Sequence, residues 1–561
     1  MKPNESSKGN DYRAAITILV AAILFSAAVR WRLRDMPLER DEGEFAYAGQ
    51  LILHGITPYQ LYYSIKLPGT HLAYAAIMAV FGQTACGVHL GLLVVNLATV
   101  ALIFCLTRDL FNPLAGAIAA AVYSLLSVSP WAYGTAAHAT HFVGIFSVAG
   151  AWVLWLAIQS ERNSFFFASG LSFGMAFMMK QHGIFLSAFA VLTILAHYIR
   201  WRPICRRKLL SGLASYAAGA ILPYAATCLW LWSAGVFGQF WFWTVTFSGA
   251  HVAENSIASV PARFWKGLKE ATGPNWPLWV AATLGALLVV RTRDDRNRRW
   301  FLCAYAAFSF LCVCPGYFFR QHYFILFLPA VAIFNGVAVV RLIESTRSKI
   351  GNESKQVVQI RSFPWLAIAI LVAIGSFVVG EQREFLFSWT PEQACKYLYG
   401  ENPFIESLAI ADYVRTHSTP KDQIAILGSE AQICFYAKRL SATGYVNTYE
   451  LMEPTPFARR LQEEMCREIE AAKPEFLVVV HIGLSWMRHG NSENHIFDWL
   501  NRYSARSYRP VGLVDLVSPT RTDYFWGDEA ADVHPRSEDF ICVLQRKKSG
   551  STKESQPQGE L

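Results

Sequence analysis

Residues 14–29 read AAITILVAAILFSAAV, and the stretch RDEGEFAYAG follows at residues 40–49. The first run is uncharged and apolar, as a helix that crosses a membrane is. The second brings the carboxylates of Asp41, Glu42 and Glu44 close to the predicted membrane surface. Carboxylates at that depth cost free energy unless they are paired with a cation, hydrated or part of a functional site. Together the two stretches predict a membrane protein with functional groups at one surface.

Composition extends this prediction to the whole chain. The protein has 561 residues, of which 53% are hydrophobic and 16% charged, whereas a soluble chain carries about 25% charged residues. Apolar runs recur along the sequence, and we predict about eleven membrane-spanning helices, several completed by flanking Trp and Tyr. The predicted spans are 14–29, 88–106, 114–129, 140–158, 165–179, 184–198, 209–233, 276–290, 301–314, 323–340 and 363–380. The fold class is therefore a polytopic α-helical membrane protein.

Basic residues indicate the orientation. With a cytoplasmic N-terminus, the Arg and Lys clusters at 200–208, 291–299 and 341–361 all lie in inner loops, as the positive-inside rule requires. The net charge of +9 thus reflects topology, and no nucleic-acid partner is predicted. Residues 30–34 are basic and lack a small-residue cleavage site, so the first span is a retained anchor. We expect a multi-pass protein of the plasma (inner) membrane whose chain after Gly380 is extracytoplasmic.

The C-terminal part has a different pattern. Helical periodicity at 405–417 and 456–472 alternates with strand-like runs, which predicts a small α/β domain. The predicted strands are 423–427, 475–481, 508–516 and 539–545. The predicted domains are a membrane domain at 1–382, an extracytoplasmic α/β domain at 383–548 and a disordered tail at 549–561.

On this topology, polar residues far apart in the chain meet at the outer face. They are Lys66, the pair His138 and His141, the pair Lys180 and Gln181, and the turn residues Arg320 and His322. Each has a structural explanation as well: a lysine can snorkel to the interface, and two histidines three residues apart more often hydrogen-bond than bind metal. The adjacent acids Asp41 and Glu42 favour a functional explanation.

Four features of the sequence resemble one family. The acidic motif 41–46 is followed by a Lys-Pro element at 66–69, a Lys-Gln pair ends the fifth span, and an Arg-x-His-Tyr turn at 320–323 precedes a span that contains Pro329. In this order they resemble GT-C fold glycosyltransferases of the dolichyl-phosphate-mannose protein mannosyltransferase family. The bacterial relatives of that family, which include the lipid A aminoarabinose transferases, share the resemblance.

The resemblance implies an inverting transfer of a sugar from a polyprenyl-phosphate donor to a hydroxyl of a lipid, glycan or protein, outside the cytoplasm. By motif position Asp41 is the catalytic base, helped by its neighbour Arg40, and Glu42 is the alternative base or an orienting partner. Lys66 is the first choice for the donor phosphate, with Lys180, Arg320 and His322 as further cations. Remaining candidate site residues are Glu44, His138, His141 and Gln181. No cofactor and no metal are predicted, although Asp41, Glu42, His138 and His141 have the chemistry of a divalent-cation site.

The sequence also departs from the family. Leu67 separates Lys66 from Pro68, Phe45 replaces a tyrosine, and no lumenal β-trefoil module is found. These differences concern the acceptor and the sugar more than the reaction. An alternative function is a transporter or flippase of polyprenyl-linked glycans, but such proteins place their sites near the bilayer midplane and often within repeats. A third is a receptor or scaffold that acts through the α/β domain.

Overall fold

The computed structural model describes residues 5–201, 205–253, 257–291, 296–353 and 364–547. Contacts divide the chain into two compact units. The membrane unit comprises Met1–Met36, Ile65–Gly238 and Asn255–Ala394, and the C-terminal unit comprises Pro37–Ser64, Gln239–Glu254 and Cys395–Leu561. The acidic stretch 40–49 therefore belongs, by its contacts, to the C-terminal unit. The domain boundary at residue 382 stays a prediction, and the predicted tail 549–561 lies outside the described residues.

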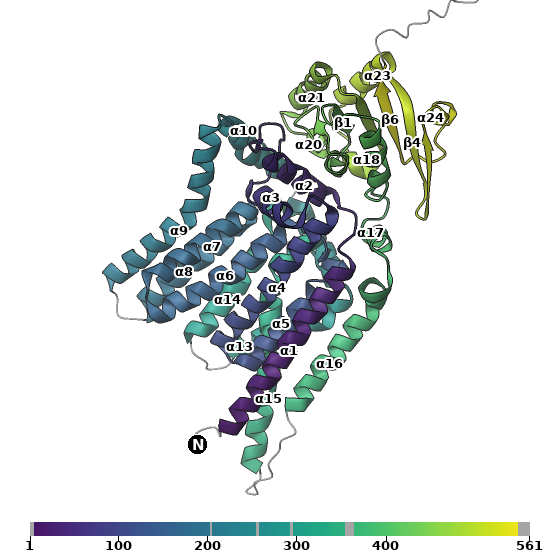
Figure 1. Cartoon of the computed structure of the whole chain (residues 1–561). Coiled ribbons are helices and arrows are strands. Elements are labelled where there is room, and N and C mark those ends of the chain that lie inside the picture. The colour runs from purple at the N-terminus through teal and green to yellow at the C-terminus, as the bar shows by residue number, and fades with distance from the viewer. Residues whose placement is uncertain (1–4, 202–204, 254–256, 292–295, 354–363, 548–561) are drawn as a thin grey trace, which may run out of the picture. The chain divides into compact units, whose positions relative to one another are not determined.

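The membrane unit is built from helices, and α4, α6 and α7 run side by side (Figure 1). Its main helices are α1 Glu5–Arg32, α3 Gly69–Phe81, α4 Ala85–Leu110, α5 Pro113–Leu126, α6 Ala139–Ser160, α7 Asn163–Met179, α8 Ile184–Ala196, α9 Arg206–Ser233, α12 Val260–Thr272, α13 Trp276–Arg291, α14 Arg296–Leu311, α15 Leu328–Glu353 and α16 Pro364–Glu381. Short helical turns join them: η1 Pro130–Ala132, η2 Gln181–Gly183, η3 His197–Trp201, η6 Gly273–Asn275, η7 Pro315–Tyr317, η8 Gln321–Leu326 and η9 Glu384–Ser388.

Among the described residues, 6 helical stretches are long and apolar enough to cross a membrane. They are Tyr12–Arg32, Ala85–Leu110, Ala139–Ser160, Gln181–Ile199, Arg206–Ser233 and Ile257–Arg291. Shorter apolar helices are Gly69–Phe81, Pro113–Leu126, Asn163–Met179, Leu328–Ile343 and Val372–Glu381. Ten of the eleven predicted spans overlap helices of these two groups, and the predicted span 301–314 overlaps α14, which belongs to neither. The prediction of a polytopic α-helical membrane protein is confirmed, and the number of crossings stays a prediction.

Helix α3 is an apolar helix that the sequence analysis missed. Pro68 precedes its first turn, and Gly82 ends it with a φ of 91°, in the left-handed region that glycine adopts without strain. Its 13 residues span about 20 Å at 1.5 Å per residue, against about 30 Å for the hydrocarbon core. The run is too short to be identified as a span.

Glycines allow α7 and α9 to pack with their backbones in contact. A Cβ atom on Gly170 would lie 2.0 Å from the carbonyl oxygen of Tyr216, and one on Gly174 would lie 2.4 Å from that of Ala220. Gly219 of α9 faces back in the same way, 2.1 Å from the carbonyl oxygen of Phe167. Small residues four apart produce this close crossing of membrane helices. The crossing fixes the end of α7, where Lys180 lies.

The C-terminal unit is a mixed sheet covered by helices. The strand order is β2-β1-β3-β6-β4-β5, in which β2, β1 and β3 are parallel and the remaining pairs antiparallel. The strands are β1 Gln423–Leu427, β2 Leu440–Ser441, β3 Phe476–His481, β4 Tyr508–Ser518, β5 Arg521–Trp526 and β6 Phe540–Arg546. The helices of this unit include α2 Arg40–Leu53, α11 Ser248–Ala253, α18 Glu406–Thr416, α19 Ala431–Ala437, α20 Tyr449–Met452, α21 Ala458–Ala472, α22 Gly483–Trp486, α23 His495–Ser507 and α24 Glu529–Asp532.

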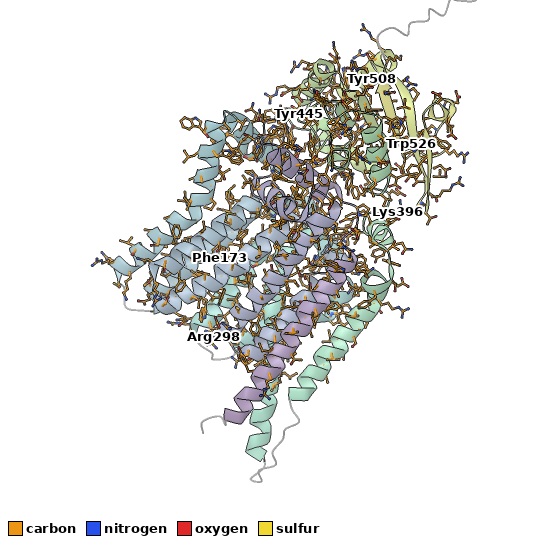
Figure 2. The ribbon with its side chains drawn as sticks, in the orientation of Figure 1. Phe173, Arg298, Lys396, Tyr445, Tyr508 and Trp526 are labelled. Carbon is orange, nitrogen blue, oxygen red and sulfur yellow. The ribbon has the colours of Figure 1, made fainter. Side chains whose placement is uncertain are left out.

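The predicted α/β domain is confirmed in its strands and helices. The four predicted strands correspond to β1, β3, β4 and β6, and the two predicted helices correspond to α18 and α21. The sequence analysis missed β2, which has 2 residues, and β5, whose sequence RTDYFW has no buried residue. The ring of Trp526 in β5 stacks on Tyr413 of α18 with centroids 4.4 Å apart, and Figure 2 labels Trp526 on the sheet. This stacking covers the outer strand.

Candidate active site

The Lys-Gln pair and the Lys-Pro element meet in the membrane unit. The Gln181 side-chain amide donates a hydrogen bond of 2.7 Å to the carbonyl oxygen of Ile65. Because Lys180 precedes Gln181 and Lys66 follows Ile65, this bond joins the two segments at the positions of both lysines. Lys180 is extended, with a φ of −158°, and separates α7 from η2. Two cationic residues 114 positions apart in the sequence thus lie on adjoining segments.

A second set of contacts packs the start of α3 against the end of α7. The Thr70 hydroxyl donates a hydrogen bond of 2.8 Å to the carbonyl oxygen of Met179. A Cβ atom on Gly69 would lie only 2.4 Å from the carbonyl oxygen of Met178. Glycine at position 69 therefore permits the approach, and the Lys-Pro element is held beside the Lys-Gln turn from both ends.

The Arg-x-His-Tyr turn contributes η8 to the same region. The Lys180 ammonium lies 3.9 Å from the centroid of the Tyr323 ring, a cation–π contact. The His322 ring stacks on His138 with centroids 4.3 Å apart and an interplanar angle of 15°. Rings of His182 and His322 meet the edge or face of Tyr323 at 5.0 and 4.8 Å. The structure thus gathers Lys180, His182 and His322 around one tyrosine, with His138 stacked on His322.

The other predicted residues of the membrane unit lie at the margins of this group. Arg320 caps the start of η8, is exposed, and places its guanidinium 5.6 Å from the Phe318 ring. His141 lies in the first turn of α6 and is buried in the bundle. The His182 ring lies 2.8 Å from the carbonyl oxygen of Cys312, which ties the Lys-Gln turn to the end of α14.

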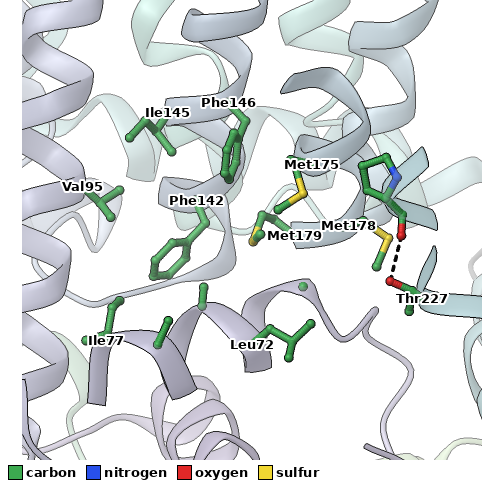
Figure 3. Close-up of a pocket in the computed structure, with 14 residues that line it drawn as sticks. Leu72, Ile77, Val95, Phe142, Ile145, Phe146, Met175, Met178, Met179 and Thr227 are labelled. Carbon is green, nitrogen blue, oxygen red and sulfur yellow. Dashed lines mark hydrogen bonds between the residues drawn. The ribbon is translucent and has the colours of Figure 1, made fainter. Parts of the chain in front are cut away.

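An apolar cavity of about 500 Å³ lies among helices of the membrane unit (Figure 3). Its lining residues come from α3, α4, α6, α7 and α9 and are Gly69, Leu72, Ala73, Ala76, Ile77, Val95, Phe142, Ile145, Phe146, Met175, Met178, Met179, Pro223 and Thr227. The only polar contact drawn is the Thr227 hydroxyl, which donates to the carbonyl oxygen of Pro223 at 2.9 Å. Gly69 and Met179 place the cavity beside the segments of Lys66 and Lys180.

In the C-terminal unit, the acidic stretch forms α2. Glu39 is the N-cap residue: its carboxylate accepts from the backbone N–H of Glu42 at 3.0 Å, and the Glu42 carboxylate accepts from the backbone N–H of Glu39 at 3.2 Å. This capping box starts the helix. Burial, together with the charges of Asp41 and Glu42, raises the pKa of Glu39.

The capping box separates the roles of the two predicted acids. The Glu42 side chain is fully buried and accepts a backbone hydrogen bond, whereas Asp41 is partly exposed. A base that takes a proton from a substrate must be within reach of that substrate. Of the two, Asp41 fits this requirement better, and Glu42 serves the start of the helix.

Glu44 is a buried anchor of the C-terminal unit. Its carboxylate accepts hydrogen bonds from the hydroxyl of Tyr62, from that of Ser64 at 2.8 Å, and from the Asn447 side-chain amide. These contacts tie α2 both to the loop that leads into the membrane unit and to the segment before α20.

Arg40 bonds groups of the C-terminal unit that lie far from it in the sequence. Its guanidinium donates to the carbonyl oxygen of Ser429 at 3.2 Å and to the Asn402 side chain at 3.0 Å. It also forms an ion pair with the buried carboxylate of Glu430 at 3.4 Å. No sequence motif marks Glu430, because it is 390 positions away and lies among apolar residues.

Within each unit the structure brings that unit's own candidates together. The predicted residues Lys66, Lys180, Gln181, His138 and His322 lie near one another in the membrane unit, with Arg320 and His141 at the margins. Asp41, Glu42 and Glu44 share α2 in the C-terminal unit. The assignment of catalytic and phosphate-binding roles stays a prediction.

Comparisons with known proteins agree with this arrangement. The sequence profile of the dolichyl-phosphate-mannose-protein mannosyltransferase family matches residues 66–232, a range that begins at Lys66 and includes Lys180. A sequence comparison with curated proteins finds no match. Among solved structures, this chain is similar to ArnT from Cupriavidus metallidurans bound to undecaprenyl phosphate, with a TM-score of 0.62 and 14% identity over 94% of this chain and 97% of that one.

It is also similar to the oligosaccharyltransferase of Archaeoglobus fulgidus in the apo form, with a TM-score of 0.56 and 11% identity over 93% of this chain and 75% of that one. A structure of that enzyme, AglB, with an inhibitory peptide and a dolichol-phosphate gives a TM-score of 0.51 at 12% identity. The chain is therefore an integral membrane protein with the GT-C fold, and its resemblance to GT-C glycosyltransferases is confirmed.

Proposed function

We propose that this protein is an inverting glycosyltransferase that moves a sugar from a polyprenyl-phosphate donor to a hydroxyl acceptor at the extracytoplasmic face of the membrane. The observation that carries the proposal is the apolar cavity of about 500 Å³ beside the segments of Lys66 and Lys180. An apolar pocket beside two segments that carry lysines has the two chemistries of a polyprenyl phosphate, which joins a hydrocarbon chain to an anion. The similar structure of ArnT holds undecaprenyl phosphate, and that of AglB holds a dolichol-phosphate.

The isoprenoid chain would occupy the cavity. Burial of each methylene-sized group contributes about 0.8 kcal/mol, and a pocket of this size lies within the usual range of about 300–1,000 Å³ for ligand sites. Met175, Met178 and Met179 contribute flexible side chains that adapt to an irregular ligand. The lining therefore favours a chain without polar groups.

The phosphate would be bound by the cations at the edge of the cavity. As the bond between the anomeric carbon and the phosphate oxygen breaks, negative charge develops on the leaving polyprenyl phosphate, and nearby positive charge stabilises it. Lys66 and Lys180 act as point charges. The cation–π contact of Lys180 with Tyr323 keeps its ammonium directed. His322 and Arg320 are the further phosphate ligands of the proposal.

Asp41 would be the base. It takes the proton of the acceptor hydroxyl while the acceptor oxygen forms a bond to the anomeric carbon, on the side opposite the departing phosphate, so the configuration inverts. A positioned base contributes about 10²- to 10⁴-fold to such a step. The proposal thus requires Asp41 and the two lysines to act on one donor molecule.

The orientation follows from the positive-inside rule. Lys180 lies directly before η2 and α8, whereas Arg206, Arg207 and Lys208 begin α9, beyond the other end of α8. The basic cluster marks the cytoplasmic side, so the lysine turn would face outside, as would the C-terminal unit. The N-terminus would be cytoplasmic.

The test is release of free polyprenyl phosphate by purified protein in lipid, with a panel of polyprenyl-phosphate sugars and native membranes as acceptor. We expect the wild type to consume one donor, and Asp41→Asn and Lys66→Ala to spare it. A wild type that is inert with every donor would refute the proposal. Movement of an intact donor between leaflets without release of polyprenyl phosphate would instead indicate a transporter.

A further inference from the structure

The sheet of the C-terminal unit contains a reversal of strand order. From β1 the chain passes to β2 on one side, and then crosses to β3 on the other side of β1. In open α/β sheets, ligands bind outside the carboxyl ends of the parallel strands at such a reversal. The turns after β1 and β3 are therefore where a binding site is expected in this unit.

The two turns form a buried polar cluster around Glu430. Ser485, after β3, donates its hydroxyl to the Glu430 carboxylate at 2.6 Å. The same hydroxyl accepts from the backbone N–H of Ser429, after β1, at 2.8 Å. The Glu430 side chain has 0% exposure. A fully buried carboxylate requires a cation or several donors, because desolvation of an isolated charge is costly.

The cation at this place comes from the chain itself. The guanidinium of Arg40 bonds Glu430, the carbonyl oxygen of Ser429 and the side chain of Asn402. Arg40 is the first residue of α2 and precedes Asp41. The position that holds a ligand in other sheets of this type is therefore occupied by the residue next to the proposed base.

Further contacts hold the same helix along its length. The backbone N–H of Leu38 donates to the hydroxyl of Tyr436 at 2.8 Å, and the hydroxyl of Tyr47 accepts from the backbone N–H of Ser441 at 2.7 Å. Between them, Gly43 lies against Gln432 of α19 so closely that a Cβ atom would be 2.7 Å from the Gln432 Cβ. The helix is thus held from the residues before its start to its middle, over positions 38–47.

We propose that the C-terminal α/β unit fixes the position of α2, and that Glu430, with Ser485 and Asn402, positions Asp41 through Arg40. The inference rests on the proposed function, and it assigns the C-terminal unit to the chemical step rather than to presentation of the acceptor. Glu430 is a positioning residue, because it contacts Arg40 and not the substrate.

The test compares Glu430→Gln with a matched control. The glutamine keeps an acceptor for Ser485 and removes the charge that pairs with Arg40. The control Glu493→Gln removes an exposed carboxylate of the same unit, which pairs with Arg459 at 3.2 Å. Because a misplacement of about 1 Å costs up to about 10²-fold in rate, we expect kcat to fall about 10- to 100-fold in Glu430→Gln, with the donor KM within about 2-fold, and no change in the control.

Hydrogen exchange of the backbone amides of residues 38–53 provides a readout that does not need activity. We expect faster exchange of these amides in Glu430→Gln and an equal increase in Arg40→Met. The double variant should show no further increase, because the two residues act through one contact. The control should exchange at the wild-type rate. Unchanged exchange in Glu430→Gln would overturn the inference, as would faster exchange with an unchanged kcat. A wild type that releases no polyprenyl phosphate would refute the proposed function alone, because hydrogen exchange still reports whether Glu430 and Arg40 fix the position of α2.

Discussion

Replacement of Gly43 by alanine tests the packing that holds α2. The added methyl group would lie 2.7 Å from the Gln432 Cβ and 2.8 Å from the Gln432 backbone nitrogen. Carbon atoms in contact prefer separations of about 3.5–4.0 Å, so α2 must move by about 1 Å relative to α19. Because the backbone of α19 lies in contact, the strain cannot be relieved by rotation of one side chain.

Two magnitudes follow. Overpacking of this kind costs about 1–3 kcal/mol, which lowers the unfolding temperature of a unit of this size by roughly 2–12 °C. A displacement of about 1 Å at a catalytic group lowers the rate by up to about 10²-fold. We therefore expect Gly43→Ala to lose both stability and polyprenyl phosphate release, with the donor KM little changed.

The assay is thermal unfolding in lipid nanodiscs together with the release rate. The matched control is Gly249→Ala, because Gly249 is also helical, belongs to the same unit, and has nothing within 4 Å of the added Cβ. If Gly43→Ala retained the stability and the rate of the control, the described packing of α2 on α19 would be refuted. Loss of stability with full activity would show that Asp41 does not depend on this packing.

Three further changes are informative. Ala76→Phe would fill part of the cavity and displace about two methylene-sized groups of the donor chain. We therefore expect the KM for long-chain donors to rise about tenfold. Short-chain donors are the control, because their KM should not change. Lys66→Ala should lower kcat about 10²- to 10³-fold, and partial activity of Lys66→Arg would show that charge is the requirement. Burial raises the folded-state pKa of Glu430, although the charge of Arg40 opposes this rise. The contribution of Glu430 to stability is therefore complete below its unfolded-state pKa and is lost as pH rises through its folded-state pKa. Unfolding temperatures measured from pH 4 to 8 should fall less in Glu430→Gln than in the wild type.

The spans and most strands of this fold are predictable because they depend on local composition. Apolar runs at 88–106 and 140–158 correspond to α4 and α6, and the runs at 423–427 and 475–481 correspond to β1 and β3. Helix α3 was missed because 13 apolar residues are ambiguous in length. The burial of such a run depends on the composition of the run itself, so it can be predicted from the sequence.

The candidate site was predictable in part for the same reason. Lys180 stands out as a cation at the end of an apolar run and Lys66 as part of the Lys-Pro element, and the structure does place their segments together. The pairing of Arg40 with Glu430 was not predictable, because it depends on how distant turns meet. The sequence left Glu42 as the alternative base or an orienting partner of Asp41, and its hydrogen bond to the N-cap backbone could not be predicted.

The packing of α2 within the C-terminal unit also bears on how such proteins evolve and can be recombined. Segments 37–64, 239–254 and 395–561 form one compact unit, so a chimera that exchanges only the C-terminal segment would pair a foreign sheet with the native acidic helix. Related sequences should accordingly change positions 40 and 430 together, and positions 43 and 432 together. A functional chimera would require all three segments from one parent.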